Sequence, residues 1–230
     1  MVTQDYGKLT QAIEDYLKAI YELTRDKDVT STSEIADRLS ISPASVTSML
    51  KRLDDFRPAL VDYQKSRGVQ LTTDGEQCAL RKIRQHRLIE LFLVEILGYS
   101  WDEIHEEAEN LEHVVSPKLE DHIAKVLGDP KFDPHGDPIP NKDLNLPETN
   151  AIPLIKIEPG QRAIVRRVRS SDSGLLKYLG EIGIKPKTII QMVSLIPFDH
   201  TIHLMVEGEI DERVIGEEIG SLVWVEVQHK

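Results

Sequence analysis

Residues 30–56, TSTSEIADRLSISPASVTSMLKRLDDF, contain two short amphipathic segments separated by a tight turn, SIS. Ser33 is the expected N-cap of a helix that ends near Leu39. Pro43 suits the first turn of a second helix that runs to about Asp55. Apolar residues recur at helical spacing in both segments and would join them in one core. The stretch therefore predicts a helix-turn-helix.

The next stretch, ALVDYQKSRGVQLTTDGEQ (59–77), predicts a β-hairpin with its turn at KSRG, followed by a new helix. A helix-turn-helix with a two-stranded wing is a DNA-binding architecture. A purely structural hairpin is the alternative, but hydroxyl-rich second helices are uncommon in such scaffolds. Hydroxyls contact bases and phosphates, and cations neutralise phosphate. The expected DNA-facing residues are Ser42, Ala44, Ser45, Thr47, Ser48, Lys51 and Arg52, with Lys65 and Arg67 at the wing tip.

The composition describes a globular chain whose charge is uneven. Of its 230 residues 40% are apolar, enough for one large domain or two to three small ones. The net charge is −11, and most of the acid excess lies in residues 77–150. The modest basic charge of the first 76 residues predicts weak non-specific DNA binding. Specific binding to a double-stranded operator then requires a homodimer that reads two half-sites.

Three features bear on location. No stretch approaches the length of an apolar membrane span, and the N-terminus lacks the basic-then-apolar plan of a signal peptide. The lone Cys78 excludes an internal disulfide and fits a reducing compartment. We therefore expect a soluble, cytoplasmic protein with no membrane partner.

The stretch HEEAENLEHVVSPKLEDH (105–122) is rich in acids and histidines, yet Lys118 is its first cation. We expect one helix here, with an apolar face made of Ala108, Leu111, Val114, Val115 and Leu119. Helical spacing places His105, Glu109, Glu112 and His113 together on one face. Converging carboxylates and imidazoles are costly without a positive partner, and a divalent metal supplies one.

An acid-rich helix is, by itself, more often a solvated face. Further metal-ligating residue types in other segments shift the balance toward a metal site. Asp15 lies on the predicted helix over 10–24, His86 and Glu90 lie one turn apart on the predicted helix over 74–97, and Asp133 and His135 lie in DPHGDP. The helix over 74–97 is apolar on more than one side, which also suits a dimer face.

Residues 128–153, GDPKFDPHGDPIPNKDLNLPETNAIP, have the composition of a linker. Beyond about residue 153 the chain changes to short β-rich runs with one helix between them, which predicts a small β-barrel. This last segment has no catalytic motif. The expected fold is thus multidomain α+β, divided as 1–76, 77–150 and 151–230.

Several separated motifs, in this order, resemble the diphtheria toxin repressor family of metal-activated transcriptional regulators. They are EDYLKAIYEL (14–23), VTSMLKRL (46–53), HRLIELFL (86–93), HEEAENLEH (105–113) and DPHGDPIP (133–140). EPGQRAIV (158–165) and YLGEIGIKP (178–186) resemble the SH3-like domain that these regulators share with ferrous-iron transport accessory proteins. The resemblance implies a winged helix-turn-helix domain, a helical metal-binding and dimerisation domain, and a C-terminal SH3-like domain.

The resemblance also implies two metal sites. One comprises Asp15, His86, Glu109, Glu112 and His113. The other involves Glu90, Asp133 and His135, with His105 as an additional ligand. The SH3-like domain of the family often donates a ligand just after RVR, where this chain has Ser170, so Asp172 is the candidate there.

Iron-responsive members of the family have Met and Cys where this chain has Asp15 and Glu109. Because hard oxygen ligands favour Mn²⁺ over softer ions, we expect a Mn²⁺-activated regulator that represses manganese uptake, with an Fe²⁺-responsive repressor as the alternative. Some manganese-type members have an acid at the place of Lys18, so a two-metal cluster of that type is not expected here.

Two further functional classes account for the sequence less well. A carboxylate-bridged di-metal enzyme requires paired Glu-x-x-His motifs. The four histidines of the helical region have other residues three positions earlier: Ile83, Asp102, Asn110 and Leu119. A metal-storage or interaction protein leaves the hydroxyl-rich helix and the wing unexplained. We therefore expect no enzyme activity and no small-molecule substrate.

Overall fold

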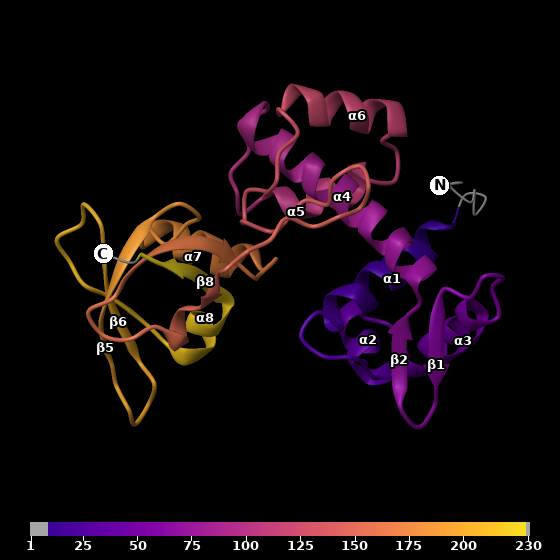
Figure 1. The fold of residues 1–230 in the computed structure, drawn as a ribbon, viewed down its shortest axis with the longest axis horizontal. Helices are drawn as coiled ribbons and strands as arrows, with labels where there is room; N and C mark the ends of the chain where they lie inside the picture. Colours follow the sequence, from indigo (N-terminus) through magenta and orange to yellow (C-terminus); the bar gives the residue numbers. More distant parts are fainter. Residues whose placement is uncertain (1–8, 229–230) are drawn as a thin grey trace. The chain divides into compact units, whose positions relative to one another are not determined.

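The computed structural model describes residues 9–228, which divide into two compact units (Figure 1). The first contains the chain up to Gln85 together with Lys142–Leu144. The second contains His86–Asn141 and the chain from Asn145 onward. Within the described residues no helix is long and apolar enough to cross a membrane.

The first unit is a winged helix-turn-helix. Its elements are α1 (Gln11–Leu23), α2 (Thr32–Leu39), α3 (Pro43–Asp54), β1 (Val61–Gln64), β2 (Gly68–Leu71) and the first half of α4 (Thr73–Glu95). Strands β1 and β2 pair antiparallel, and the turn between them is the predicted KSRG. The core of the unit is formed by buried residues of all four helices and both strands, among them Leu17, Ile35, Leu50 and Val69.

Local hydrogen bonds explain where the two central helices begin. Ser31, and not the predicted Ser33, caps α2, because Glu34 lies three residues after it and completes a capping box. Ser42 caps α3 through the N–H of Ser45, and Pro43 occupies the first helical position. A left-handed residue, Ser40 (φ 54°), ends α2 and forms the tight turn.

The second unit begins with the rest of α4, followed by α5 (Ile104–Leu111) and α6 (Pro117–Val126). The prediction of one helix over 105–122 is wrong. Ser116 caps α6 and Pro117 takes its first position, because proline cannot continue a preceding helix. The break leaves Val114 and Leu119 76% and 49% exposed, and beyond α5 only Val115 of the predicted apolar face packs against the core.

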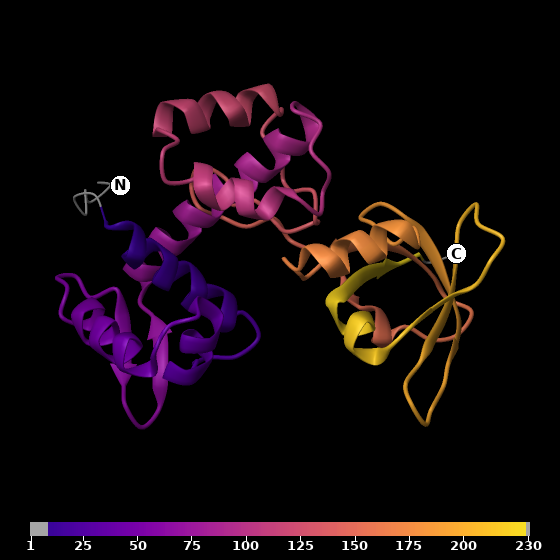
Figure 2. The same ribbon diagram turned by 180° about the vertical axis from the view of Figure 1, so that it is seen from behind.

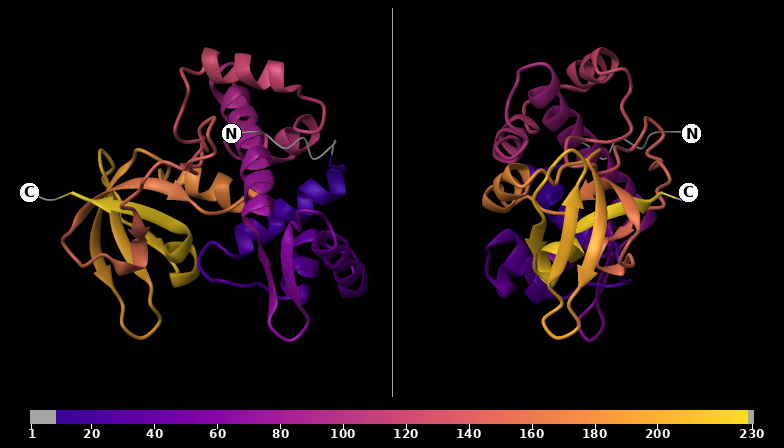
Figure 3. Two further views of the ribbon diagram at one scale, coloured as in Figure 1. Left: turned by 45° about the vertical axis from the view of Figure 1, so that its right-hand side comes forward. Right: turned by 90° about the vertical axis from the view of Figure 1, so that its left-hand side faces the viewer.

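The C-terminal part of the second unit is a six-stranded antiparallel sheet in the order β3-β8-β4-β5-β6-β7. Figures 2 and 3 show this part from further sides. Its strands are β3 (Ile152–Pro153), β4 (Arg162–Val168), β5 (Ile189–Leu195), β6 (Ile202–Val206), β7 (Arg213–Ile215) and β8 (Val223–Val227). Its helices are the 3-10 turn η1 (Leu154–Lys156), α7 (Ser173–Glu181) and α8 (Glu217–Leu222). Trp101, which precedes α5, also packs into the core of this part.

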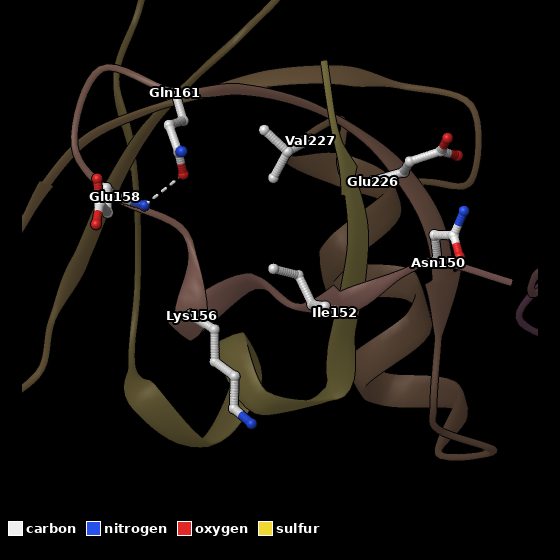
Figure 4. Close-up of a pocket in the computed structure, with 7 residues that line it drawn as sticks. All are labelled: Asn150, Ile152, Lys156, Glu158, Gln161, Glu226 and Val227. Carbon is white, nitrogen blue, oxygen red and sulfur yellow. Dashed lines mark hydrogen bonds between the residues drawn. The ribbon is translucent and has the colours of Figure 1, made fainter. Parts of the chain in front are cut away.

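A hollow lies beside β8 (Figure 4). One hydrogen bond crosses its rim, from the N–H of Glu158 to Oε1 of Gln161. The hollow is lined by Asn150, Ile152, Lys156, Glu158, Gln161, Glu226 and Val227. These residues include no histidine, so the hollow does not have the mixed imidazole and carboxylate donors found around α4.

Candidate metal centre

A buried histidine of α4, His86, has polar partners on both ring nitrogens. Its Nδ1 lies 2.5 Å from Oε2 of Glu112. Its Nε2 lies 2.9 Å from Oε1 of Glu90, one helical turn later, and 3.2 Å from Nδ1 of His105 on α5. His86, Glu90 and His105 each offer a ligand atom, and these atoms lie within 4.8 Å of one another.

The electrostatics of Glu90 depend on its histidine neighbours. Burial alone would raise the pKa of Glu90, but His86 and His105 outweigh it and hold this pKa well below its usual range. A buried carboxylate is therefore ionised here only because positive charge faces it. The carboxylate oxygen and imidazole nitrogens of this group are also donor atoms that suit a divalent cation.

A second group combines Glu90 with Asp133 and His135 from the loop after α6, and all three side chains are buried. Nε2 of His135 donates to the carbonyl oxygen of Trp101 at 2.7 Å, which leaves the lone pair of Nδ1 for a ligand. Burial raises the pKa of Asp133 well above its usual range, and the charges of Asp137 and Glu90 add to this effect.

The donors fit a hard or borderline divalent ion. Both groups offer only carboxylate oxygen and imidazole nitrogen, the ligand types that suit Mn²⁺, Fe²⁺ and Zn²⁺. Hydrogen bonds within the loop fix Asp133, because its Oδ1 accepts the N–H groups of His135 and Asp137, each at 2.8 Å. Such fixed ligands reduce the entropy that is lost on binding.

The other predicted ligands occupy different environments. Glu112 is buried beside His86, and Nε2 of His113 lies 3.8 Å from Oε1 of Glu112. The side chain of Glu109 is 53% exposed, with Oε1 3.7 Å from Nε2 of His105.

Two predicted ligands are not members of the groups around Glu90. Asp15 lies on α1 in the first unit, and its role as a ligand stays a prediction. Asp172 is exposed and caps α7 by accepting the N–H of Leu175 at 2.7 Å. Asp172 belongs to neither group of the second unit.

Sequence reasoning missed the buried guanidinium of Arg87 and its partner Asp137. Nη2 of Arg87 lies 3.2 Å from Oδ1 of Asp137, and Nε lies 3.6 Å from Oδ2 of Asp133. The signal was the second aspartate of DPHGDP, four residues after Asp133. An aspartate four residues after a predicted ligand is a candidate partner for a cationic side chain near that ligand.

Most of the predicted DNA-facing residues are exposed, as residues that contact DNA must be. Ser42, Ala44, Ser45, Ser48, Lys51 and Arg52 of the α3 region are exposed, as are Lys65 and Arg67 in the wing turn, and Thr47 is half-buried. Three of the hydroxyl groups already have local partners. Oγ of Ser42 lies 2.9 Å from Oγ of Ser45, and Thr47 donates to the carbonyl of Pro43.

Comparison with protein families covers almost the whole chain. Residues 8–69 match the iron-dependent repressor N-terminal DNA-binding domain, and residues 72–141 match the iron-dependent repressor metal-binding and dimerisation domain. Residues 152–227 match the FeoA domain. The diphtheria toxin repressor of Corynebacterium diphtheriae is 34% identical over 163 residues, covering 70% of this chain and 71% of that protein. The chain belongs to the diphtheria toxin repressor family of metal-dependent transcriptional repressors.

Other members of the family are similar over most of their length. The iron-dependent repressor IdeR of Mycobacterium leprae is 31% identical over 77% of this chain and 82% of its own. A solved manganese-dependent transcriptional repressor in complex with manganese has a TM-score of 0.87 and 34% identity, covering 94% of this chain and 100% of that one. The structure of ScaR with bound Zn²⁺ has a TM-score of 0.80 and 36% identity, covering 93% and 98%. The winged helix, helical domain and C-terminal sheet predicted from the sequence are confirmed as those of this family.

Proposed function

We propose that this chain is a Mn²⁺-activated repressor that binds double-stranded operator DNA as a homodimer and controls manganese uptake. The observation that carries the proposal is the pair of groups around Glu90, buried except for the half-buried His105, which offer oxygen and nitrogen but no sulfur. Mn²⁺ accepts such ligands in six-coordinate geometry. Fe²⁺ is the alternative ion, since the same ligand types bind it and iron-dependent repressors are among the relatives.

Hydrogen bonds within the chain orient the two histidines that would bind the ion. His86 is held by Glu90 and Glu112, and His135 is held by the carbonyl of Trp101, so both imidazoles keep fixed orientations. A bound divalent cation would add positive charge beside these carboxylates. We infer that Asp15 adds a carboxylate from the helix before the DNA-reading helices, together with Glu109, Glu112 and His113. This part rests on the sequence.

Several properties support DNA binding by a dimer. The exposed hydroxyls and cations of α3 and the wing suit contacts to bases and phosphates. The second unit exposes apolar side chains that a partner copy would cover: Ile96, Leu97, Val114, Leu119 and Val126. We infer domain limits of 1–76, 77–150 and 151–230, a cytoplasmic location, and no catalytic role.

The test starts from the full chain loaded with Mn²⁺. Duplexes are selected from a random pool, and the affinity for the selected duplex is then measured with Mn²⁺, anaerobic Fe²⁺ and Zn²⁺ at matched free concentrations. We expect tight binding with Mn²⁺ and loss of binding with chelator. Equal activation by Fe²⁺ would overturn the manganese assignment, and tight binding without any metal would overturn metal activation itself.

A further inference from the structure

The two carboxylate oxygens of Asp133 lie in different surroundings. Oδ1 accepts the backbone N–H groups of His135 and Asp137, both at 2.8 Å. Oδ2 faces the buried guanidinium of Arg87, whose Nε is 3.6 Å away. Oδ2 is therefore the oxygen best placed to ligate an ion in the group that Asp133 forms with Glu90. Arg87 is the cation that competes for it.

The separation of 3.6 Å is longer than a hydrogen bond, and two contacts explain why Arg87 stops short. Nη1 of Arg87 donates to the carbonyl oxygen of Pro138 at 2.5 Å, and Nη2 lies 3.2 Å from Oδ1 of Asp137. Both acceptors belong to the same loop as Asp133. The loop thus binds both terminal nitrogens of the Arg87 guanidinium. Its Nε faces Asp133 but is too far from Oδ2 for a hydrogen bond.

Asp137 is itself fixed from the neighbouring sheet. Arg167 of β4 forms an ion pair with Oδ1 of Asp137, the oxygen that also faces Arg87. The N–H of Val168 donates to the carbonyl of His135 at 2.8 Å, which joins the loop backbone to the same strand. Asp137 therefore cannot follow Arg87 toward Asp133 without breaking its contact with β4.

We propose that Asp137 is a positioning residue that holds Arg87 away from Asp133 and so leaves Oδ2 of Asp133 open to a divalent cation. The inference rests on the proposed metal group. Without the charge of Asp137, a shift of under about 1 Å brings Nε of Arg87 into hydrogen-bonding range of Oδ2. A charge-assisted pair would then form at the ligand, and an ion would have to break it.

Asp137 acts through Arg87 in this proposal and is not a ligand. The donor atoms of Glu90, Asp133 and His135 lie within 4.8 Å of one another, and Asp137 is not part of that group. Its Oδ1 faces two guanidinium groups instead. This arrangement separates a ligand carboxylate from a carboxylate that controls the nearby cation, although the two are only four residues apart.

The experiment measures Mn²⁺ binding to the full chain from the spin-resonance signal of free Mn²⁺, with circular dichroism of the metal-free protein as a folding check. Asp133→Asn removes a ligand of this group, so the Mn²⁺ that is lost in this variant is the ion that the group binds. Asp137→Asn is expected to weaken that same Mn²⁺ by about 10- to 100-fold, as loss of an outer partner typically does. Arg87→Gln, added to Asp137→Asn, is expected to restore most of the affinity because the competing cation is gone.

The control is Arg166→Gln, which removes an exposed guanidinium of β4 that pairs with Glu226 and should leave Mn²⁺ binding unchanged. If the double variant binds no more tightly than Asp137→Asn, Asp137 acts by shaping the loop and the proposal is overturned. Should Asp137→Asn fail to fold, Arg87→Gln alone decides, since the proposal expects its affinity to equal or exceed that of the parent and a fall contradicts it. If Asp133→Asn leaves Mn²⁺ binding unchanged, this inference fails, while metal-activated DNA binding would still support the proposed function.

Discussion

Glu90 belongs to both buried groups of the second unit, so its removal should weaken every ion that those groups hold. The change is Glu90→Gln, which keeps the shape of the side chain and removes its charge. At free Mn²⁺ about 100 times the dissociation constant, one bound ion stabilises the folded chain by about 2.7 kcal/mol. A 100-fold weaker site retains only about 0.4 kcal/mol under the same conditions.

The difference is about 2.3 kcal/mol for one ion and about twice that for two. For a chain of this size each kcal/mol moves the unfolding temperature by about 2–4 °C. Glu90→Gln should therefore reduce the Mn²⁺-induced rise in unfolding temperature by about 9–18 °C, and Asp133→Asn, which removes one group only, by about half as much. Each variant is compared with and without metal, so that changes in the metal-free protein cancel.

The assay is thermal unfolding followed by circular dichroism, and Glu95→Gln is the matched control because Glu95 is exposed on the same helix. The control should keep the full metal-induced rise. If Glu90→Gln and Asp133→Asn reduce the rise equally, the two groups share one ion and the reasoning from two groups is refuted. If neither reduces it, neither group binds Mn²⁺.

Three further predictions concern DNA reading, the loop and the choice of metal. Ser45→Ala should reduce the preference for the selected duplex over random DNA, whereas Lys51→Ala should weaken both and lower the salt slope by about one, as competition binding at several salt concentrations will show. Gly136→Ala should displace the loop from β4, because φ is +83° and a Cβ would lie 1.8 Å from the carbonyl oxygen of residue 166. The expected result is faster amide exchange in β4 together with weaker Mn²⁺ binding. Asp15→Met with Glu109→Cys should shift DNA binding toward anaerobic Fe²⁺ at matched free metal, and no shift would contradict the role of these two positions.

The sequence predicted the first unit well because its signals are local. The turn residues of the wing and Pro43 at the start of α3 act within a few positions of themselves. The cap of α2 was misplaced by two residues, since that segment offers several hydroxyls in a row. Only the pairing of Ser31 with Glu34 distinguishes them, and that spacing is itself a readable signal.

The helix over 105–122 was misread for a different reason. Val114, Val115 and Leu119 continue the apolar spacing of α5, and this pattern outweighed Ser116 and Pro117 in the prediction. In the structure, Ser116 followed by Pro117 begins a new helix although the apolar spacing continues across these two residues. Glu112 consequently ends α5 and turns its carboxylate to His86.

The metal-ligating residue types were found from the sequence, and the resemblance grouped His86 with Glu112 and Glu90 with Asp133 and His135. The contacts of His86 with His105 and of Arg87 with Asp137 were not predicted. His86 contacts His105 and Glu112, which lie 19 and 26 residues later, and Arg87 contacts Asp137, 50 residues later. Such pairings depend on how α5 and the loop after α6 pack against α4, which no local pattern encodes. The sequence assigned His86 and Glu90 to separate ligand sets, whereas one turn of α4 brings them into direct contact.

No residue of the C-terminal sheet belongs to the two groups around Glu90. The loop that carries Asp133 and His135 nevertheless connects the sheet to these groups. The loop that carries Asp133 and His135 faces Glu90 on one side and is bonded to β4 on the other, through His135 and Asp137. Trp101 accepts from the ring of His135 and packs into the core of the sheet. A residue that orients ligands need not touch the ion, so the sheet can control the ion's affinity through the position of this loop. Substitutions in β4 that displace this loop but leave every ligand intact should therefore still change metal binding, as Gly136→Ala tests from the loop side.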